Sequence, residues 1–505
     1  MTSANRPIDS ASARPIAGAP AAWQSPAPDP NDRYRSALEA RNASPAMQAI
    51  WSPRRRIATW RRLWLALAEA QHELGLPVSR AQVEAIRAHL DDIDFEAAAA
   101  HEARLRHDVM AHVHALGDVA PEARAIIHLG ATSQDIVCNA DLLILDDAMR
   151  LVAEKVAGVV DALGRFAVRW RATPTLGFTH YQPAQPVTVG KRACLWAQDL
   201  ALSLEEVEAR RAALRIRGLR GATGTQASFL ALCDGDAAKV AALERDFIAR
   251  LGWRGRPVLA VSGQTYTRLV DAQIVNALAV VAAAIHKCCN DLRLLAGAKE
   301  IEEPFEPEQI GSSAMAYKRN PMRCERATGL CRFVMAMAQN PLNTAATQWL
   351  ERTLDDSSNR RLALPEPFLA LDGALDILRN VCDGLVVHEA TIRANLMREL
   401  PFMATENLMM AAVRHGADRQ DAHEVIRRHS QAAAMRVKDE GGPNDLLERL
   451  RAEPIFAGMD LGEVLDPRAY VGLAPQQVDS FVAEIVEPIR SRHSGRIAAA
   501  TALRV

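Results

Sequence analysis

Apolar residues recur every three or four positions along much of the chain. The first clear run spans residues 59–74, with Trp60, Leu63, Trp64, Leu67 and Ala70 on one side. This spacing is typical of a helix that buries one face. Pro77 ends the run, and Ser79 is suited to cap a second helix. The pattern therefore predicts a helical N-terminal region.

Three longer helical runs follow, which we expect over residues 141–171, 187–217 and 268–296. The third is apolar on nearly all sides, as in a helix at the centre of a bundle. Its uncharged part, residues 272–285, is shorter than the about 18 apolar residues that a membrane span needs. The middle of the chain is thus predicted to be a bundle of long helices, with no membrane segment.

Composition supports a helical protein with a sizeable core. The 505 residues are 49% hydrophobic but only 5% aromatic, so small aliphatic side chains fill the interior and favour closely packed helices. The net charge of −1 does not suggest a nucleic-acid partner or an anionic membrane. Residues 1–30 are rich in Ala, Pro and Ser without apolar periodicity, which predicts a disordered extension.

The cysteines indicate neither disulfides nor a metal site. None of the eight cysteines forms a Cys-x-x-Cys pair, and no secretory signal is visible, so we expect reduced thiols, a cytoplasmic location and no zinc. The glycines at 218, 221 and 224 lack the spacing of a dinucleotide-binding fingerprint, and no strand precedes them. No cofactor is predicted.

The most informative interruption between helices is the 311–321 loop, Gly-Ser-Ser-Ala-Met-Ala-Tyr-Lys-Arg-Asn-Pro. Gly311 is expected to take backbone angles that other residues avoid, and Pro321 to lead into the next helix. Positive charge gathers around its serines, from Lys318, Arg319, Arg323 and Arg326. Such a loop suits a site that closes over a multiply anionic substrate, although small and charged residues between helices more often form a solvated loop.

Three other segments carry candidate chemistry. Prolines 183 and 186 keep His180 in an extended connection between long helices; a loop histidine of this kind is more often solvated than catalytic. The triplet 106–108, Arg-His-Asp, begins a helix on which His107 alone would usually be structural. After Glu351, either Asp356 or Ser357 can cap a helix on which Ser357 and Arg361 share a face. That arrangement fits a phosphate or an ordinary salt-bridged surface helix.

Together these segments resemble a known family. The 311–321 loop is similar to the Gly-Ser-Ser-x-Met-Pro-x-Lys-x-Asn-Pro pattern of the fumarase/aspartase superfamily, with Ala316 in place of the proline. Its continuation through Glu325 and Arg326, and the segments 106–133, 177–200 and 349–361, resemble the adenylosuccinate lyase family in particular. The resemblance extends from about residue 33 to 488.

The resemblance implies an all-α, three-domain fumarase/aspartase-type fold with a central long-helix bundle. The family forms homotetramers in which each active site is shared between subunits. On this chain we expect an N-terminal extension (1–30), an N-terminal helical domain (31–132), the central bundle domain with the 311–321 loop (133–387) and a C-terminal helical domain (388–505). The partners implied are nucleotide substrates and further copies of the chain.

The implied reaction is β-elimination of fumarate from adenylosuccinate and from the succinyl-aminoimidazole-carboxamide ribotide. Carried over to this sequence, Ser312 is the base and His180 the acid, while Glu325 orients His180 or its neighbours. The succinyl carboxylates are assigned to Lys318, Asn320, Thr132, Ser133, Thr179 and Gln264, with Ser313 beside the base. The nucleotide side is assigned to Arg41, Arg326, Arg352, Ser357 and Arg361, with Arg106, His107 and Asp108 near the phosphate; His107 is also counted as catalytic. Asn42 stands where the family has a tyrosine, which weakens the assignment of Arg41.

Two other functions remain open from the sequence. The chain could be another fumarate-releasing lyase, such as an argininosuccinate lyase, but the arginines after Glu351 suit a phosphate better than a free amino acid. It could also be a non-catalytic structural protein on the same fold. The joint presence of His180, Ser312, Lys318 and Glu325 speaks against that reading.

Overall fold

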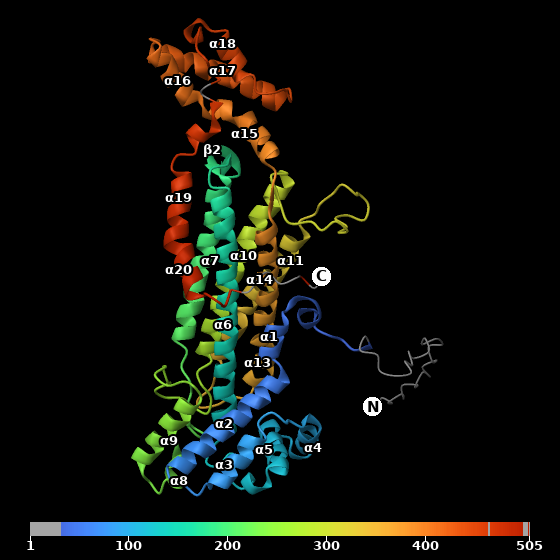
Figure 1. Ribbon diagram of the computed structural model, residues 1–505, viewed down its shortest axis with the longest axis vertical. Helices are drawn as coiled ribbons and strands as arrows, with labels where there is room; N and C mark the ends of the chain where they lie inside the picture. Colours follow the sequence, from blue (N-terminus) through green and yellow to red (C-terminus); the bar gives the residue numbers. More distant parts are fainter. Residues whose placement is uncertain (1–31, 463–464, 498–502, 504–505) are drawn as a thin grey trace, which may run out of the picture.

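The structure is a computed structural model that describes residues 32–462, 465–497 and 503. Its described part is almost wholly helical and elongated, with the N-terminal helices at one end of a long bundle and a small helical unit at the other (Figure 1). The predicted extension 1–30 lies outside the described residues. The all-α fold is confirmed.

The N-terminal helices begin where the sequence provides caps. Ser79 accepts the backbone N–H of Gln82, whose side chain in turn accepts the Ser79 N–H, so the predicted cap is confirmed as a capping box. The face predicted on the first helix is buried, with Trp60, Leu63 and Trp64 at most 1% exposed. The elements are η2 (Leu38–Asn42), α1 (Pro45–Ile50), α2 (Pro53–Glu73), α3 (Arg80–Ala88), α4 (Phe95–Leu105), α5 (Asp108–Val119) and η3 (Pro121–Ala123).

Five long helices form the central bundle: α6 (Ser133–Arg169), α7 (Val189–Ala212), α10 (Leu269–Gly297), α11 (Met322–Met337) and α14 (Pro365–Gly384). Neighbouring contacts run from α6 to α7, α10, α11, α14 and back to α6, so the helices close a ring around one apolar core. By length and composition α10 could cross a membrane, and it is alone in this among the described helices. Half of its most apolar window is buried in the protein, as expected for a bundle helix.

The helix bounds differ from the predicted ones at two ends. The first bundle helix begins at Ser133 and not at Asp141, because Asp135 accepts the Thr132 N–H at 2.8 Å and caps the helix eight residues earlier. The second ends at Ala212 and not at Arg217, because Arg217 turns into the interior to pair with Asp135. The 37 residues of α6 give it a length of roughly 55 Å.

Short elements connect the bundle helices. The strands β1 (Pro174–Thr179) and β2 (Gln182–Thr188) form an antiparallel hairpin beyond the end of α6, and β3 (Ile301–Glu302) pairs with β4 (Val386–Val387). The short helices are α8 (Ala227–Leu232), α9 (Ala237–Arg250), α12 (Gln339–Ala346) and α13 (Asp356–Ala363).

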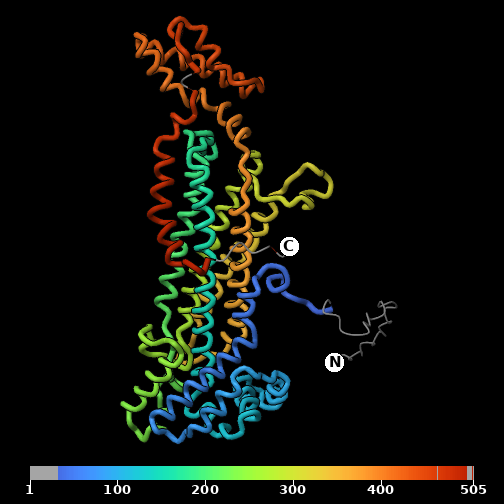
Figure 2. The backbone as a smooth tube through the Cα atoms, in the orientation of Figure 1, coloured from blue at the N-terminus to red at the C-terminus, as the bar shows by residue number. Residues whose placement is uncertain are grey.

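The chain after residue 388 first builds a second, smaller core and then returns to the bundle. The second core lies among α15 (Glu389–Met403), α16 (Thr405–Arg414), α17 (Arg419–Asp439), α18 (Leu446–Arg451), η4 (Pro454–Phe456) and η6 (Pro467–Tyr470). The last elements, α19 (Ala474–Phe481), η7 (Val482–Val486) and α20 (Glu487–Arg492), run back along α7 and α6 (Figure 2). The domain bounds expected at 132/133 and 387/388 stay a prediction.

Candidate active site

A cleft of about 640 Å³ opens at the N-terminal end of α6. Its volume lies within the range of small-molecule pockets. Nine of the residues singled out in the sequence line it, namely Arg106, His107, Asp108, Thr132, Ser133, Gln264, Arg352, Ser357 and Arg361. They come from four separate segments of the chain, which the fold brings together at this end of the bundle.

Helix ends set the positions of the histidine and the serine in this cleft. Arg106 takes a left-handed conformation (φ 55°) that ends α4 and turns the chain into α5. His107 precedes the first residue of α5, and its Nδ1 accepts the Met110 N–H at 3.4 Å. Its Nε2 lies 3.4 Å from Oγ of Ser133, the first residue of α6. The N-terminal N–H groups of α6 therefore face the same space as His107.

A second helix start brings arginines to the cleft. α13 begins at Asp356, and Arg361 donates from Nη2 to Oδ2 of Asp108 at 2.9 Å. Ser357 and Arg361 line the cleft together, as predicted. Neither predicted capping residue caps α13: Asp355 is the cap position, and Asp356 binds two arginines instead. The combination of two helix starts and several arginines favours an anionic ligand.

A buried ion pair holds the wall of the cleft. Asp135 and Arg217 are both fully buried and form an ion pair. Arg217 also donates to the carbonyl oxygen of Gly263 at 3.1 Å, and the next residue, Gln264, donates its N–H to the Glu351 carbonyl at 2.9 Å. Thus one carboxylate that caps α6 also fixes the segments that carry Gln264 and Arg352.

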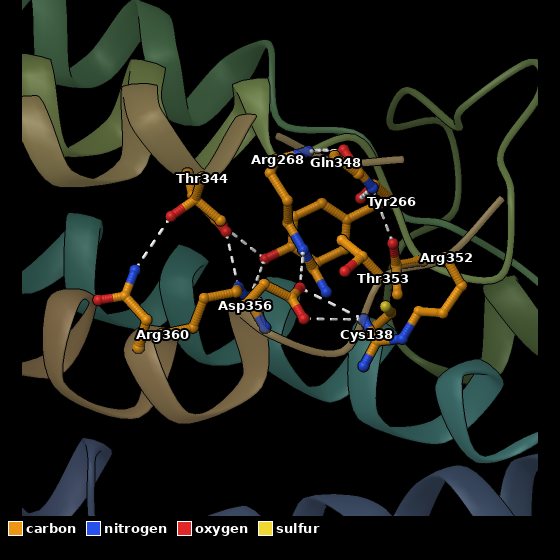
Figure 3. A network of polar contacts seen from close by, with 12 residues as sticks. Cys138, Tyr266, Arg268, Thr344, Gln348, Arg352, Thr353, Asp356 and Arg360 are labelled. Atoms are coloured by element: carbon orange, nitrogen blue, oxygen red, sulfur yellow. Dashed lines mark hydrogen bonds and ion pairs between the residues drawn. The ribbon is translucent and has the colours of Figure 1, made fainter. Parts of the chain in front are cut away.

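A second buried network lies beneath α13 (Figure 3). Tyr266 is fully buried. The guanidinium groups of Arg268 and Arg360 lie over its ring, 4.6 and 5.3 Å from the ring centroid. The Tyr266 hydroxyl donates to Asp271 at 2.6 Å, and Asp271 also accepts from Arg360 at 2.7 Å. Arg360 reaches Asp141 at 3.1 Å.

Two histidines behind the cleft are held neutral. Burial lowers the pKa of His112 to about 4, and the charges of Arg61 and Arg56 act in the same direction. Burial also lowers the pKa of His128 to about 4, and its Nδ1 accepts the indole N–H of Trp64 at 3.1 Å. Neither belongs to the predicted site.

His180 lies at the tip of the β1–β2 hairpin and not in the cleft. Thr179 pairs with Gln182, so His180 and Tyr181 are the two central residues of a tight turn. Both have left-handed backbones, with φ of 53° and 57°, as the twist of a two-residue hairpin requires. This conformation is strained for a residue other than glycine, and strained backbone conformations are more frequent at functional sites. The ring of Tyr181 stacks on Phe178 at 5.8 Å, and His180 itself is exposed.

The 311–321 loop is closed at its base by side-chain and backbone contacts. Asn320 donates to the Gly311 carbonyl at 2.8 Å, and Glu303 accepts the N–H groups of Arg323 and Cys324 at 2.9 and 3.0 Å. Gly311 is not among the glycines with a positive φ. A glycine is needed because a Cβ there would lie 2.2 Å from the Lys318 carbonyl oxygen.

Within the loop, Ser312 has an amide donor. Its Oγ accepts the Met315 N–H at 3.2 Å. The side chains of Ser313 and Lys318 are exposed, as are the apolar ones of Ile310, Met315 and Tyr317. These exposed apolar side chains indicate that the loop packs against something other than its own chain.

Arg326 joins the loop region to the start of the described chain. It donates to the side chain of Asn42 at 2.9 Å and to the Arg41 carbonyl at 2.9 Å. The predicted pair of Arg41 and Arg326 is thus in one place, with Asn42 as a hydrogen-bond partner of Arg326. Glu325 lies 3.7 Å from Arg293 and not beside His180.

The predicted site residues therefore form three groups in one chain. The first is the cleft, the second is the hairpin with Thr179 and His180, and the third is the 311–321 loop with Ser312, Ser313, Lys318, Asn320, Glu325, Arg326 and Arg41. Sequence reasoning missed other residues of the cleft: Arg56, Trp60, Glu102, Asp141 and Arg360. Of these, Arg360 had a visible signal, since it stands beside Arg361 in the same arginine-rich run. In the described residues no cluster of His, Cys, Asp and Glu could hold a metal ion.

Comparisons with known proteins identify related sequences. Residues 29–336 match the family model described as Lyase, and residues 401–481 match the one described as Adenylosuccinate lyase C-terminus. The adenylosuccinate lyase of Schizosaccharomyces pombe is 50% identical over 454 residues, which are 89% of this chain and 94% of that protein. That of Saccharomyces cerevisiae is 48% identical over 90% of this chain and 95% of its own length.

Solved structures share the fold. The 3-carboxy-cis,cis-muconate lactonizing enzyme from Pseudomonas putida superposes with a TM-score of 0.76 at 26% identity, over 90% of this chain and 99% of the other. The fumarate lyase from Mesorhizobium sp. BNC1 gives a TM-score of 0.73 at 26% identity, over 88% of this chain and 99% of the other.

Proposed function

The chain belongs to the adenylosuccinate lyase family, and from that premise we propose that it releases fumarate from adenylosuccinate, giving AMP, and from the related succinyl-aminoimidazole-carboxamide ribotide. It is a carbon–nitrogen lyase. The observation that carries the proposal is the cleft in which arginines and two helix starts surround His107 and Ser133.

The reaction needs a base, an acid and positive charge. A proton leaves the carbon beside a carboxylate and creates a dianion, while the C–N bond breaks and the departing nitrogen takes up a proton. An acid and a base are each worth roughly 10²–10⁴ in rate, and many enzymes exceed 10⁶. The remainder is supplied by orientation and by fixed charge near the dianion.

Ser312 is proposed as the base. A serine hydroxyl accepts a proton from carbon only as an alkoxide, which needs donors and cations around it. The Met315 N–H already donates to Ser312 Oγ, and Lys318 is in the same loop without a described ion pair. Closure of the loop over the substrate brings that cation toward the alkoxide.

His180 is proposed as the acid. Its place on a hairpin tip presents the imidazole to a partner surface, and the stacked pair of Phe178 and Tyr181 holds the turn in one conformation. Thr179, beside it, is assigned to a succinyl carboxylate together with Lys318, Asn320, Thr132, Ser133 and Gln264. Ser313 is assigned to the same substrate-binding loop.

The nucleotide end is assigned to the arginines. Arg352, Ser357 and Arg361 line the cleft near the α13 start and suit the phosphate, with Arg106, His107 and Asp108 on the facing side. Arg41 and Arg326 suit the rest of the nucleotide. Glu325 is assigned to orienting catalytic groups contributed by another subunit, since it has no contact with His180 in its own chain.

We also propose a homotetramer with shared active sites. Apolar side chains are exposed along α7 and α10, including Leu195, Leu202, Val280 and Leu294, and a face of this kind is buried when helices of several subunits pack together. The eight free, buried cysteines suit a cytoplasmic enzyme.

Fumarate release tests the proposed function. The purified protein should release fumarate from both substrates without added metal and should leave argininosuccinate intact. Activity on argininosuccinate with none on the two nucleotides would overturn the assignment.

A further inference from the structure

Asp356 pairs with two arginines, Arg352, which lines the cleft, and Arg268, which is buried. Arg352, which lines the cleft, donates from Nη1 to both oxygens of Asp356 at 3.1 and 3.3 Å. Arg268 donates from Nε to Oδ2 of the same carboxylate at 2.7 Å. In Figure 3, dashed lines from both Arg268 and Arg352 meet at the carboxylate of Asp356.

Arg268 is a fixed anchor and not a ligand of the cleft. It is 1% exposed and does not line the cleft. Its guanidinium lies over the Tyr266 ring, and its backbone N–H is held by Gln348 at 2.9 Å. Asp356, 5% exposed, is the carboxylate that it contacts among the described residues.

The charges in this network are unevenly shared. Arg360 is matched by Asp271 and Asp141, whereas Arg268 and Arg352 share Asp356. The Asp356 group thus has one arginine charge in excess, whereas the Arg360 group, whose Asp141 also lines the cleft, has one carboxylate charge in excess. A carboxylate that holds both oxygens against Arg352 Nη1 also fixes the direction of its guanidinium without cancelling its attraction for an anion.

We propose that Asp356 is a positioning residue for Arg352. The buried Arg268 anchors the Asp356 carboxylate, and this carboxylate orients Arg352 so that its remaining N–H groups meet the substrate phosphate. This rests on the proposed function. Its physical advantage is preorganisation: a free arginine loses several rotamers when it binds a phosphate, and an arginine that is already fixed does not.

The test compares inhibition by AMP, which carries the phosphate, with inhibition by fumarate, which does not. In Asp356→Asn the inhibition constant of AMP and the KM for adenylosuccinate should rise about tenfold, while kcat and the inhibition constant of fumarate change less than about twofold. Arg352→Gln should raise the AMP constant at least as much, and adding Asp356→Asn to it should raise the constant little further.

Tyr266→Phe is the matched control. It removes a buried hydroxyl from the same network and disturbs the Asp271 branch, but it leaves the ring under Arg268 and the contacts of Asp356. It should lower the melting temperature and leave the AMP constant unchanged. If Asp356→Asn does not fold, Arg268→Lys tests the same link, since it keeps the buried charge but removes the Nε donor; the AMP constant should rise selectively there too.

The outcomes separate this inference from the function on which it rests. An unchanged AMP constant in Asp356→Asn, or an equal rise in Tyr266→Phe, overturns the positioning role while the lyase assignment stands. An unchanged AMP constant in an active Arg352→Gln enzyme overturns the phosphate role of Arg352 itself. A wild-type protein without activity on adenylosuccinate overturns the proposed function.

Discussion

His107 and His180 lie at opposite ends of α6. His107 is 3.4 Å from Ser133, the first residue of the helix, and His180 is on the hairpin that follows its last residue, Arg169. A helix of this length keeps the two imidazoles tens of ångströms apart, on the scale of its roughly 55 Å. One chain cannot bring both to one substrate, so a site that uses both needs at least two subunits.

The close approach of Gly311 to Lys318 gives a first prediction. In Gly311→Ala the new Cβ would meet the Lys318 carbonyl at 2.2 Å, so the base of the loop must open and Ser312 must move. We expect kcat to fall on the order of 10²-fold, because small displacements of a reacting group are costly. The melting temperature should change little, since residues 313–319 of the loop are exposed and can shift without disturbing the core.

Gly297→Ala is the control for that variant. Gly297 is the last residue of α10, and a Cβ there meets no atom within 4 Å. Steady-state kinetics and thermal unfolding of both variants make the measurement. Equal activity in the two variants would show that the 311–321 loop does not depend on this contact.

The buried histidines predict an acid-sensitive stability. The pKa of His112 is lowered to about 4 in the folded protein, so the unfolded chain binds a proton there first as the pH falls. The free energy of unfolding is therefore highest, as far as this group is concerned, above about pH 6.5. It decreases as the pH falls toward 4, by about 3 kcal/mol for one histidine. His128, with its pKa also lowered to about 4, adds a loss in the same direction.

Replacing His112 isolates its contribution to the pH dependence of stability. His112 packs edge-on against Trp60 and Phe95, and its Nδ1 has no hydrogen-bond partner, so His112→Phe removes the titrating group without breaking a bond at that atom. Urea unfolding at pH 7 and pH 5 should show a smaller difference in this variant than in the wild type. His423→Gln, at an exposed position of α17, should retain the full difference; an unchanged difference in His112→Phe would contradict the account.

The sequence predicted local features well because their causes are local. The apolar face around Trp60 and the Ser79 cap depend on residues within a few positions, and the structure has both. The first bundle helix was predicted to begin at Asp141, whereas α6 begins at Ser133, where Asp135 caps the helix and also pairs with Arg217, 82 residues away. No local pattern reveals such a partner.

The candidate site was predictable as residues but not as geometry. The resemblance supplied Arg352, Ser357 and Arg361, which do meet in the cleft with His107. It did not supply Tyr266, Arg268 or the second role of Asp356. Those depend on buried pairs between distant segments, as in the 2.7 Å contact of Arg268 with Asp356 across 88 residues.

The exposed apolar face of α7 and α10 gives a further prediction. Leu202 and Val280 are 54% and 49% exposed in the single chain. A charge at a buried interface without a partner is strongly unfavourable, so Leu202→Glu combined with Val280→Glu should dissociate the oligomer and abolish activity. Light scattering after gel filtration measures the mass, and circular dichroism checks that the helices persist.

Met435→Glu is the matched control for the interface. Met435 is 62% exposed on α17, in the small helical unit beyond the bundle. That variant should keep the oligomer and its activity. A double variant that retains the wild-type mass would show that the α7–α10 face is not the interface.

Complementation tests the shared active site. Ser312→Ala and His180→Gln should each abolish turnover and leave the fold intact, because His180 is exposed, Ser312 is half-buried in a loop, and neither belongs to an apolar core. When the two variants are dissociated, mixed in equal amounts and reassembled, some sites receive Ser312 from one chain and His180 from another. If the chains mix at random, each residue is intact with a chance of one half, so about a quarter of the wild-type activity should return.

A third chain makes this result decisive. The double variant Ser312→Ala/His180→Gln, mixed with His180→Gln in the same way, forms hybrids in which no site has an intact His180, and it should stay inactive. Each variant dissociated and reassembled alone gives the background. Hybrids are verified by a mass tag on one chain. Recovery in the first mixture alone means that Ser312 and His180 act in one site from different subunits. Verified hybrids without recovery would mean that one of the two roles, or the sharing, is wrong.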